Sequence, residues 1–305
     1  MREKFLLIDL PNLFYRAFFA VPRTLKNKNG QVTNAVFGTC SMILSLIENV
    51  KPTHILAFKD LKAKTFRHEK DDEYKAQRPD MPEELVGQLS YIDEFFIISG
   101  IPLIAVEGFE ADDGIATFAS TYNKDADVVI VSSDHDLFSL ISEENVSVMR
   151  PIKGAEVEIM DREKVKAKTG VYPEQMADFK AMRGDASDNL VGIKGIGEKT
   201  AATLLTKYDT LENIYSNIDK IEGKKKELLI NGKDEALHTK SMVTLIKDVP
   251  LGDINLEYAK IDDIPWDRVR EFFIENNFRM LIKRLDNSLL KDDQENDSDE
   301  QLSFF

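Results

Sequence analysis

The chain has one cysteine, no long apolar run and no excess of basic residues. The single cysteine among 305 residues, Cys40, cannot form an internal disulfide, which excludes a disulfide-stapled secreted scaffold and favours a reducing compartment. No apolar stretch reaches the roughly 18 residues of a membrane-spanning helix. The best candidate, residues 95–106, is interrupted by Ser99, Gly100 and Pro102. We therefore expect a soluble protein that acts in the cytoplasm and contacts no membrane.

The charge balance is acidic. Asp and Glu number 54 against 40 Lys and Arg, which gives a formal net charge of −14. Taken alone, this charge argues against a nucleic-acid partner, because affinity for a polyanion comes from neutralising phosphates. The charge is unevenly distributed, however, since residues 291–300 carry six acidic residues and one basic residue. If other carboxylates converge on bound cations, the remaining surface can still hold basic patches.

Three apolar runs, over residues 4–9, 53–60 and 126–136, end in acidic residues. Such runs, separated by helical patterns over 34–49, 82–98 and 112–122, predict a parallel sheet with crossover helices, and therefore an α/β fold. Ligands of open α/β sheets bind beyond the carboxyl ends of the strands. The sequence therefore predicts that the acids ending these runs lie along one edge.

The pattern changes near residue 172. Helical patterns dominate beyond it, over 175–182, 199–207, 211–217, 224–229 and 266–273. We predict an α/β core over 1–172, a helical subdomain over 173–290 and a hydrophilic tail over 291–305 that is too charged to pack.

Acidic residues gather at three places besides Asp9 and Asp60: residues 110–113, 134–136 and 185–188. Helix capping explains one such group, but not acids at strand ends, a helix start and a distant loop together. Two carboxylates ~4 Å apart repel by about 4 kcal/mol at an effective dielectric near ~20, unless cations lie between them. Carboxylate oxygens favour Mg²⁺ or Mn²⁺ as the bound ion. A zinc site is not expected, because the four histidines are scattered along the sequence without ligand spacing. Two Mg²⁺ or Mn²⁺ ions are an apparatus for phosphodiester hydrolysis. The alternative is that these acids are only helix caps and surface charges.

Two segments suit phosphate binding. The first combines closely spaced glycines with bases ahead of a helical run: Gly192, Lys194, Gly195, Gly197, Lys199 and Thr200. Its backbone N–H groups and helix start suit a phosphate, but it lacks the spacing of a nucleotide-binding P-loop, so we expect no ATP binding. The second segment, Lys62 to Arg78, places lysine and arginine residues around Phe66 and Tyr74. It suits either single-stranded nucleic acid stacked on the rings or a solvated helical face.

Together these motifs resemble the bacterial 5′ nucleases related to flap endonucleases, which include the amino-terminal 5′–3′ exonuclease domain of DNA polymerase I. The match runs from about Phe5 to about Ile246. It includes YRAFFA from residue 15, TNAV from 33, TFRHE from 65, YKAQR from 74, GFEADD from 108, GDASDN from 184 and GIKGIGEKT from 192.

The resemblance implies a PIN-like parallel-sheet core with a helical arch over about 62–95, and two Mg²⁺ or Mn²⁺ ions. The resemblance implies metal-binding roles for Asp9, Asp60, Glu110, Asp112, Asp113 and Asp134. Of these, Asp9, Asp60, Glu110, Asp112 and Asp134 would place the first ion. The implied ligands of the second ion, or of its waters, are Asp136, Asp185 and Asp188. The resemblance also implies three catalytic residues with positively charged side chains. These are Lys75, near the scissile phosphate, and Arg78 and Arg16, as phosphate contacts. The glycine turn resembles a helix-hairpin-helix element that holds duplex DNA, often with K⁺.

Three departures from the family pattern are Leu10 in place of glycine, His135 in place of a common lysine, and Lys59 in place of an apolar residue. Leu10 can tilt Asp9, so we expect an effect on rate rather than on the class of reaction. The chain end, Gln301, Leu302, Ser303, Phe304 and Phe305, resembles the pentapeptide that binds the bacterial sliding clamp. A chance apolar ending is the alternative.

The sequence therefore predicts a stand-alone, monomeric, nucleoid-associated 5′ nuclease that cuts DNA at 5′ ends, nicks or flaps. One rival is a DNA-structure-binding clamp adaptor that has lost hydrolysis. Another is an RNA-cutting metal nuclease, against which the helix-hairpin-helix element argues.

Overall fold

The computed structural model describes residues 2–142, 144–152, 157–252, 254 and 256–287. These residues form two compact units, each assembled from separate stretches of the chain. The first unit draws its described residues from 1–12, 52–80 and 103–256, and the second from 13–51, 81–102 and the chain from 257 onward.

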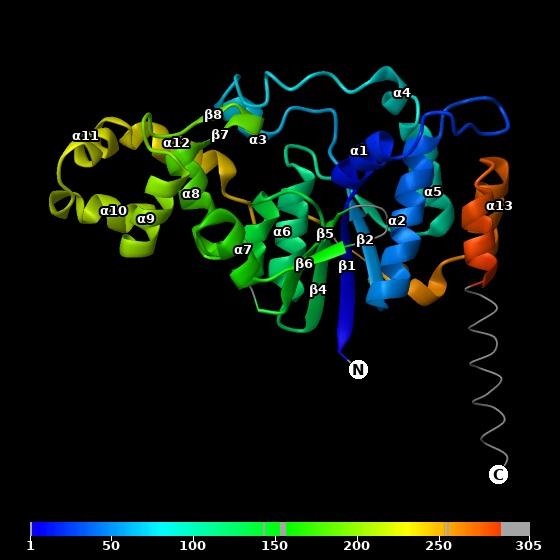
Figure 1. Ribbon diagram of the computed structural model, residues 1–305. Coiled ribbons are helices and arrows are strands. Elements are labelled where there is room, and N and C mark those ends of the chain that lie inside the picture. The colour runs from blue at the N-terminus through cyan, green and yellow to red at the C-terminus, as the bar shows by residue number, and fades with distance from the viewer. Residues whose placement is uncertain (1, 143, 153–156, 253, 255, 288–305) are drawn as a thin grey trace, which may run out of the picture. The chain divides into compact units, whose positions relative to one another are not determined.

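The first unit is built on a six-stranded sheet with the order β3-β2-β1-β4-β5-β6. The strands are β1 (Glu3–Asp9), β2 (His54–Phe58), β3 (Leu103–Ile104), β4 (Ala126–Val131), β5 (Val146–Pro151) and β6 (Val157–Met160). All neighbours are parallel except β5 and β6. In Figure 1, β1 runs beside β2 and β4. The predicted α/β fold with a parallel-dominated sheet is confirmed.

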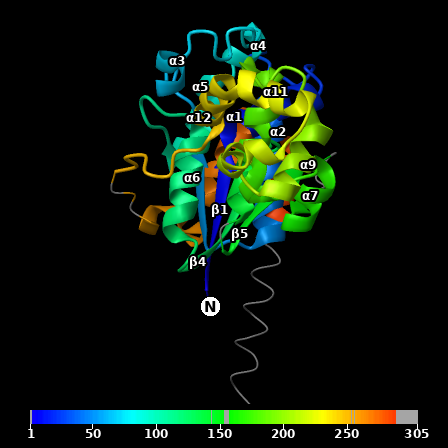
Figure 2. The same ribbon diagram turned by 90° about the vertical axis from the view of Figure 1, so that its left-hand side faces the viewer.

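The central strands are apolar because the sheet interior is buried. Residues 5–8 of β1 are 0% exposed, and β2 is buried along its whole length. Helix α6 (Ala111–Tyr122) contacts β1, β2 and β4 and runs alongside the sheet in Figure 2. Two strands are shorter than predicted: β2 ends at Phe58 and β4 at Val131. Asp60 and Asp134 therefore lie in loops just beyond the strands.

Helices make up the rest of the first unit. They are α3 (Phe66–Lys70), α7 (Arg162–Thr169), α8 (Met176–Arg183), α9 (Glu198–Tyr208), α10 (Leu211–Ser216), α11 (Lys224–Asn231) and α12 (Lys233–Val243). Short 3-10 turns, among them η1 (Asp136–Ser142) and η3 (Ala186–Asp188), and a hairpin of β7 (Gly184–Asp185) and β8 (Leu190–Val191) connect them. Helices were predicted at α8, α9, α10 and α11, whereas α7 and α12 were not predicted; all six lie in the same compact unit as the sheet.

The second unit is helical. It contains most of α1 (Leu10–Ala20), α2 (Asn34–Val50), α4 (Glu83–Val86), α5 (Leu89–Ser99) and α13 (Trp266–Glu275). The expected single helix over 82–98 is wrong, because it is interrupted between α4 and α5. There the buried Gln88 side chain accepts a hydrogen bond from the Ala35 backbone N–H at 2.9 Å and donates one to Asn34. Gln88 thus satisfies a free donor in the first turn of α2.

Candidate metal centre and nucleic-acid interface

The sheet topology places the first acids. Strand order reverses between β1 and β4, which are neighbours although two strands and their connections separate them in sequence. In open α/β sheets the crevice for ligands lies at such a reversal, outside the carboxyl ends. Asp9 is the last residue of β1, and Asp134 follows β4 by three positions. Both acids therefore lie at the edge where a ligand is expected.

Hydrogen bonds fix the Asp9 carboxylate. One oxygen accepts a bond from the Ser132 hydroxyl at 2.5 Å, and the other from the Asn12 backbone N–H at 3.2 Å. Ser132 also accepts a bond from the Asp134 backbone N–H at 2.9 Å, which ties the two acids together. Leu10 is buried at the start of α1, and Asp9 keeps these partners with leucine at that position.

The start of α6 brings further acids to the same place. Glu110 is the N-cap of α6, and Asp60 accepts a hydrogen bond from the Ala111 backbone N–H at 2.8 Å. Free N–H groups at a helix start attract carboxylates, which explains how Asp60 reaches α6 from a strand end. We call Asp9, Asp60, Glu110, Asp112 and Asp134 the first acidic group.

Crowding in the first acidic group favours protonated carboxyls. Burial, with repulsion from Asp134 and Asp60 added and the hydrogen bonds of Ser132 and Asn12 opposing, raises the pKa of Asp9 to about 7. Loss of water and the charges of Asp9 and Asp134 raise the pKa of Asp112 well above its usual value. Desolvation also raises the pKa of Asp60. A bound cation would favour the ionised forms of all three.

A second acidic group consists of Asp136, Asp185 and Asp188. Each offers one oxygen such that all three oxygens lie within 4.8 Å of one another, a spacing that could hold a metal ion. The Asp136 backbone N–H donates to an Asp134 oxygen at 2.9 Å, so the two acidic groups are joined. Only carboxylate oxygens contribute, and this donor set fits Mg²⁺ or Mn²⁺.

Basic side chains already contact the second acidic group. The Lys180 ammonium pairs with Asp185 at 2.5 Å and also with Asp136, and the Arg78 guanidinium pairs with Asp188 at 2.6 Å. Burial raises the pKa of Asp185, but the Lys180 charge and the hydrogen bonds of Lys180 and Ser187 outweigh it and lower that pKa to about 2.

The segment from Thr65 to Arg78 links the two acidic groups. The Tyr74 hydroxyl lies 3.1 Å from an oxygen of Glu110 and 3.1 Å from an oxygen of Asp188. The Lys75 ammonium pairs with Glu110 at 2.7 Å, and the Lys75 backbone N–H donates to the Asp188 carbonyl. Two of the three positively charged side chains predicted to be catalytic therefore contact these acids, Lys75 at Glu110 and Arg78 at Asp188. Arg16 lies on α1 in the second unit.

The structure corrects two expectations, one for Tyr74 in this segment and one for Asp113 in α6. Tyr74 is 3% exposed, so its ring fits neither of the two alternatives that the sequence left open, stacking on a nucleic-acid base or lying on a solvated helical face. Asp113 is fully buried, and both of its oxygens accept hydrogen bonds from the Arg67 guanidinium. Arg67 and Tyr74 were visible within the family motifs, but their buried roles were not. Ser132 begins the segment that carries Asp134 and Asp136, but its bond to Asp9 was not predicted, and Lys180 carried no signal in the sequence.

The predicted glycine turn lies between β8 and α9, and its first glycine packs against the start of β7. A Cβ at Gly192 would lie 2.2 Å from the Gly184 backbone nitrogen, so only glycine fits there. Gly195 has a φ of +91°, which side chains rarely adopt. Gly197 is the N-cap of α9, and the Thr200 backbone N–H already donates to its carbonyl. The Lys194 and Lys199 side chains are exposed beside this helix start, where a phosphate can reach them.

The predicted sliding-clamp motif, Gln301, Leu302, Phe304 and Phe305, lies outside the described residues. None of the helices in the described part of the chain combines the length and the apolarity that a membrane crossing requires.

Sequence comparison finds two families. The family described as 5′-3′ exonuclease, N-terminal resolvase-like domain, matches residues 4–170, and the family described as 5′-3′ exonuclease, C-terminal SAM fold, matches residues 171–267. DNA polymerase I of Caldicellulosiruptor bescii is 37% identical over 285 residues, which are 92% of this chain and 33% of that protein. DNA polymerase I of Bacillus subtilis is 38% identical over 286 residues, 93% of this chain and 32% of that protein. The chain thus spans about a third of the length of these relatives.

Solved structures share the fold. A zinc-bound 5′-exonuclease of T5 superposes with a TM-score of 0.65 at 21% identity, covering 90% of this chain and 100% of that one. A bacteriophage T5 flap endonuclease, in a pseudo-enzyme-product complex with DNA and metal ions, gives 0.64 at 20% identity, covering 95% and 98%. The catalytic core of Rad2 in complex with DNA substrate gives 0.58 at 15% identity, covering 89% and 86%.

Proposed function

The chain belongs to the 5′-3′ exonuclease family, and from this premise we propose that it hydrolyses DNA phosphodiester bonds at 5′ ends, nicks or flaps with the help of divalent metal ions. The observation that carries the proposal is the pair of joined acidic groups at the carboxyl edge of the sheet. Burial, with repulsion between the carboxylates added, raises the pKa of Asp9 to about 7, and bound cations would stabilise the ionised carboxylates.

We assign the acids by their surroundings. The first acidic group would hold one Mg²⁺ or Mn²⁺ ion and the second acidic group another. Such ions stabilise charge on phosphate oxygens and lower the pKa of water. Asp113, whose carboxylate is engaged by Arg67, would position Glu110 instead of binding metal: its side chain accepts a bond from the Glu110 backbone N–H at 3.2 Å.

The basic side chains would bind the substrate phosphate. Lys75 has a left-handed backbone conformation, with φ of +57°, and its ammonium pairs with Glu110. A phosphate entering between the acidic groups would meet this ammonium and the half-exposed Arg78 guanidinium. Each would offset the charge that develops on the phosphate during hydrolysis. Arg16 remains a proposed phosphate contact from α1.

The helical part would hold duplex DNA. The exposed Lys194 and Lys199 beside the α9 start support phosphate binding at this turn, and a K⁺ ion at its carbonyls is part of the proposal. The two family matches, over 4–170 and 171–267, support a nuclease core over 1–172 and a helical DNA-binding subdomain that begins at 173, whereas the chain from 257 onward belongs to the second unit. A chain that acts on chromosomal DNA would work as a monomer in the cytoplasm, at the nucleoid.

The test is digestion of labelled substrates. Nicked DNA, 5′-flap DNA and single-stranded RNA are each incubated with Mg²⁺, with Mn²⁺ and with EDTA. The proposal expects flap or nick cleavage with either ion and none with EDTA. DNA binding without cleavage would instead support the adaptor function, and faster loss of the RNA would support an RNA nuclease.

A further inference from the structure

Lys180 lies inside the second acidic group. It is on α8, its side chain is 8% exposed, and its ammonium contacts two of the three acids, Asp136 and Asp185. Arg78, the other cation of this group, contacts Asp188 alone and is 50% exposed at its side chain. Lys180 is therefore the cation most enclosed by these carboxylates.

The ammonium and a metal ion need the same oxygens. A divalent ion held by all three acids must take an oxygen from Asp136 and from Asp185, the two partners of Lys180. Two cations this close repel, and a carboxylate oxygen that contacts the ammonium has weaker charge to offer the ion. The ion and the Lys180 ammonium therefore compete for the oxygens of Asp136 and Asp185.

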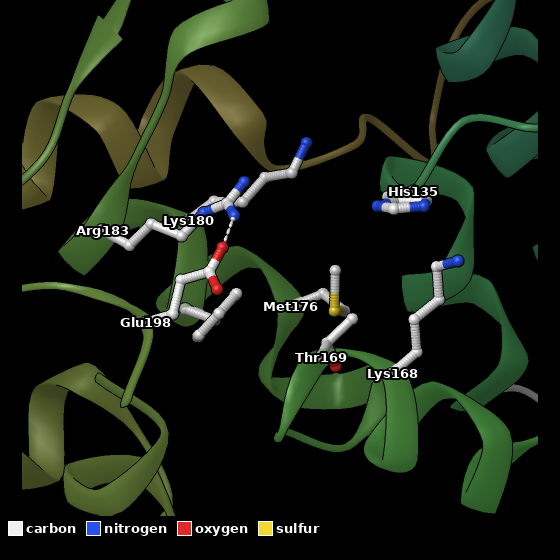
Figure 3. Close-up of a pocket in the computed structure, with 8 residues that line it drawn as sticks. His135, Lys168, Thr169, Met176, Lys180, Arg183 and Glu198 are labelled. Carbon is white, nitrogen blue, oxygen red and sulfur yellow. Dashed lines mark hydrogen bonds and ion pairs between the residues drawn. The ribbon is translucent and has the colours of Figure 1, made fainter. Parts of the chain in front are cut away.

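A pocket of about 130 Å³ gives the side chain somewhere to move. Lys180 itself lines it, together with Met176, Phe179 and Glu198. In Figure 3, the Glu198 carboxylate lies on the side of the pocket near Lys180, paired with Arg183 at 2.5 Å. The methionine and phenylalanine can pack against the lysine stem, and Glu198 offers an alternative partner for its ammonium.

We propose that Lys180 is a built-in counter-cation of the second acidic group, and that a divalent ion entering this group displaces its ammonium toward the pocket. The proposal rests on the proposed function, because it takes these acids to be metal ligands. It follows that Lys180 weakens metal binding there while keeping the acids charged, close together and ready for the ion.

The competition is tested by Mn²⁺ binding, measured by electron paramagnetic resonance, in the wild type, Lys180→Met and Lys168→Met. Lys168 lines the same pocket but forms no ion pair or hydrogen bond with these three acids in the described part of the chain, so its variant is the matched control. We expect Lys180→Met to bind an ion about tenfold more tightly or better, and Lys168→Met to match the wild type. The gain should vanish when Asp185→Asn is added. Equal or weaker affinity in Lys180→Met would overturn the proposal.

A second measurement needs no substitution. The ammonium resonance of Lys180, assigned by NMR in the full chain without metal, should shift on saturation with Mg²⁺ and return with EDTA. Suppose that the resonance does not change, although Asp185→Asn lowers the number of bound ions by one. Metal then binds to the second acidic group without displacing Lys180, which refutes this inference and leaves the proposed function standing. If Asp185→Asn leaves the number of bound ions unchanged, the second acidic group holds no metal, and the metal assignment of the proposed function fails with it.

Discussion

The Arg67 guanidinium holds the Asp113 carboxylate at both oxygens, at 2.6 and 2.9 Å, with neither side chain more than 3% exposed. Arg67 also donates to the backbone carbonyls of Met242 at 2.7 Å and Thr244 at 3.3 Å. One buried side chain thus joins the start of α6, where Glu110 lies, to the end of α12. The position of the first acidic group therefore depends on a contact with the helical part of the unit.

Arg67→Met should lower the free energy of unfolding by about 3–5 kcal/mol, because it leaves the buried Asp113 carboxylate without its counter-charge. Urea unfolding measures the change. The control is Lys64→Met, which breaks an exposed pair with Asp72 and should cost less than about 1 kcal/mol. Equal effects of the two substitutions would mean that the Arg67 pair does not hold the fold together.

The raised pKa of Asp9 predicts how stability depends on pH in metal-free protein. Folded Asp9 keeps its proton up to about pH 7, whereas the unfolded chain releases it near the ordinary carboxyl pKa of 3.8. Because the folded state binds more protons in this window, the stabilisation is complete below the unfolded pKa and is lost as pH rises through the folded one. The shift corresponds to roughly 4 kcal/mol.

Asp9→Asn removes this titration. Measured in EDTA, the wild type should therefore lose stability relative to Asp9→Asn as pH rises from 4 to 8, and added Mg²⁺ should reverse the loss at the higher pH. Parallel stability curves for the two proteins would show that Asp9 titrates normally.

Gly192→Ala should destabilise the hairpin between α8 and α9. The added methyl group would lie 2.2 Å from the Gly184 nitrogen and 2.6 Å from the Met182 carbonyl oxygen, so backbone must shift, at a cost of roughly 1–3 kcal/mol or more. Binding of duplex DNA, measured by fluorescence anisotropy in EDTA, should weaken as well. Gly197→Ala is the matched control, since nothing lies within 4 Å of its added methyl group and its φ is −97°. If both variants unfold alike, the close approach at Gly192 is unimportant.

Deletion of residues 301–305 should abolish binding to a bacterial sliding clamp and leave cleavage of short oligonucleotides intact. The five residues lie beyond an acidic stretch and carry the two phenylalanines that a clamp groove would bind. Surface plasmon resonance with immobilised clamp measures the affinity. An unchanged affinity would refute the clamp motif.

The sequence was sufficient to predict that the acids at the strand ends lie at one edge of the sheet. The reason is that buried, apolar strands in parallel order place all their carboxyl ends at the same edge. Asp9 ends β1, Asp60 and Asp134 follow β2 and β4, and the carboxyl ends of these strands meet at one edge. It was insufficient for the side chains that hold those acids. Arg67 finds Asp113 46 residues away and Met242 175 residues away, and no local pattern encodes such pairings. The burial of Tyr74, for which the sequence left a stacking ring and a solvated helical face as alternatives, is likewise decided by tertiary contacts.

The central claim is that the two acidic groups gather divalent ions for hydrolysis, and Asp134 tests it because it interacts with both groups. The decisive measurement is the rate of 5′-flap cleavage in Mg²⁺ by Asp134→Asn, with Asp125→Asn at the opposite end of β4 as the control. The account predicts that Asp134→Asn loses at least about 100-fold in rate, because several kcal/mol of transition-state stabilisation depend on the metal, and still binds the flap. Cleavage by Asp134→Asn at the wild-type rate would contradict it.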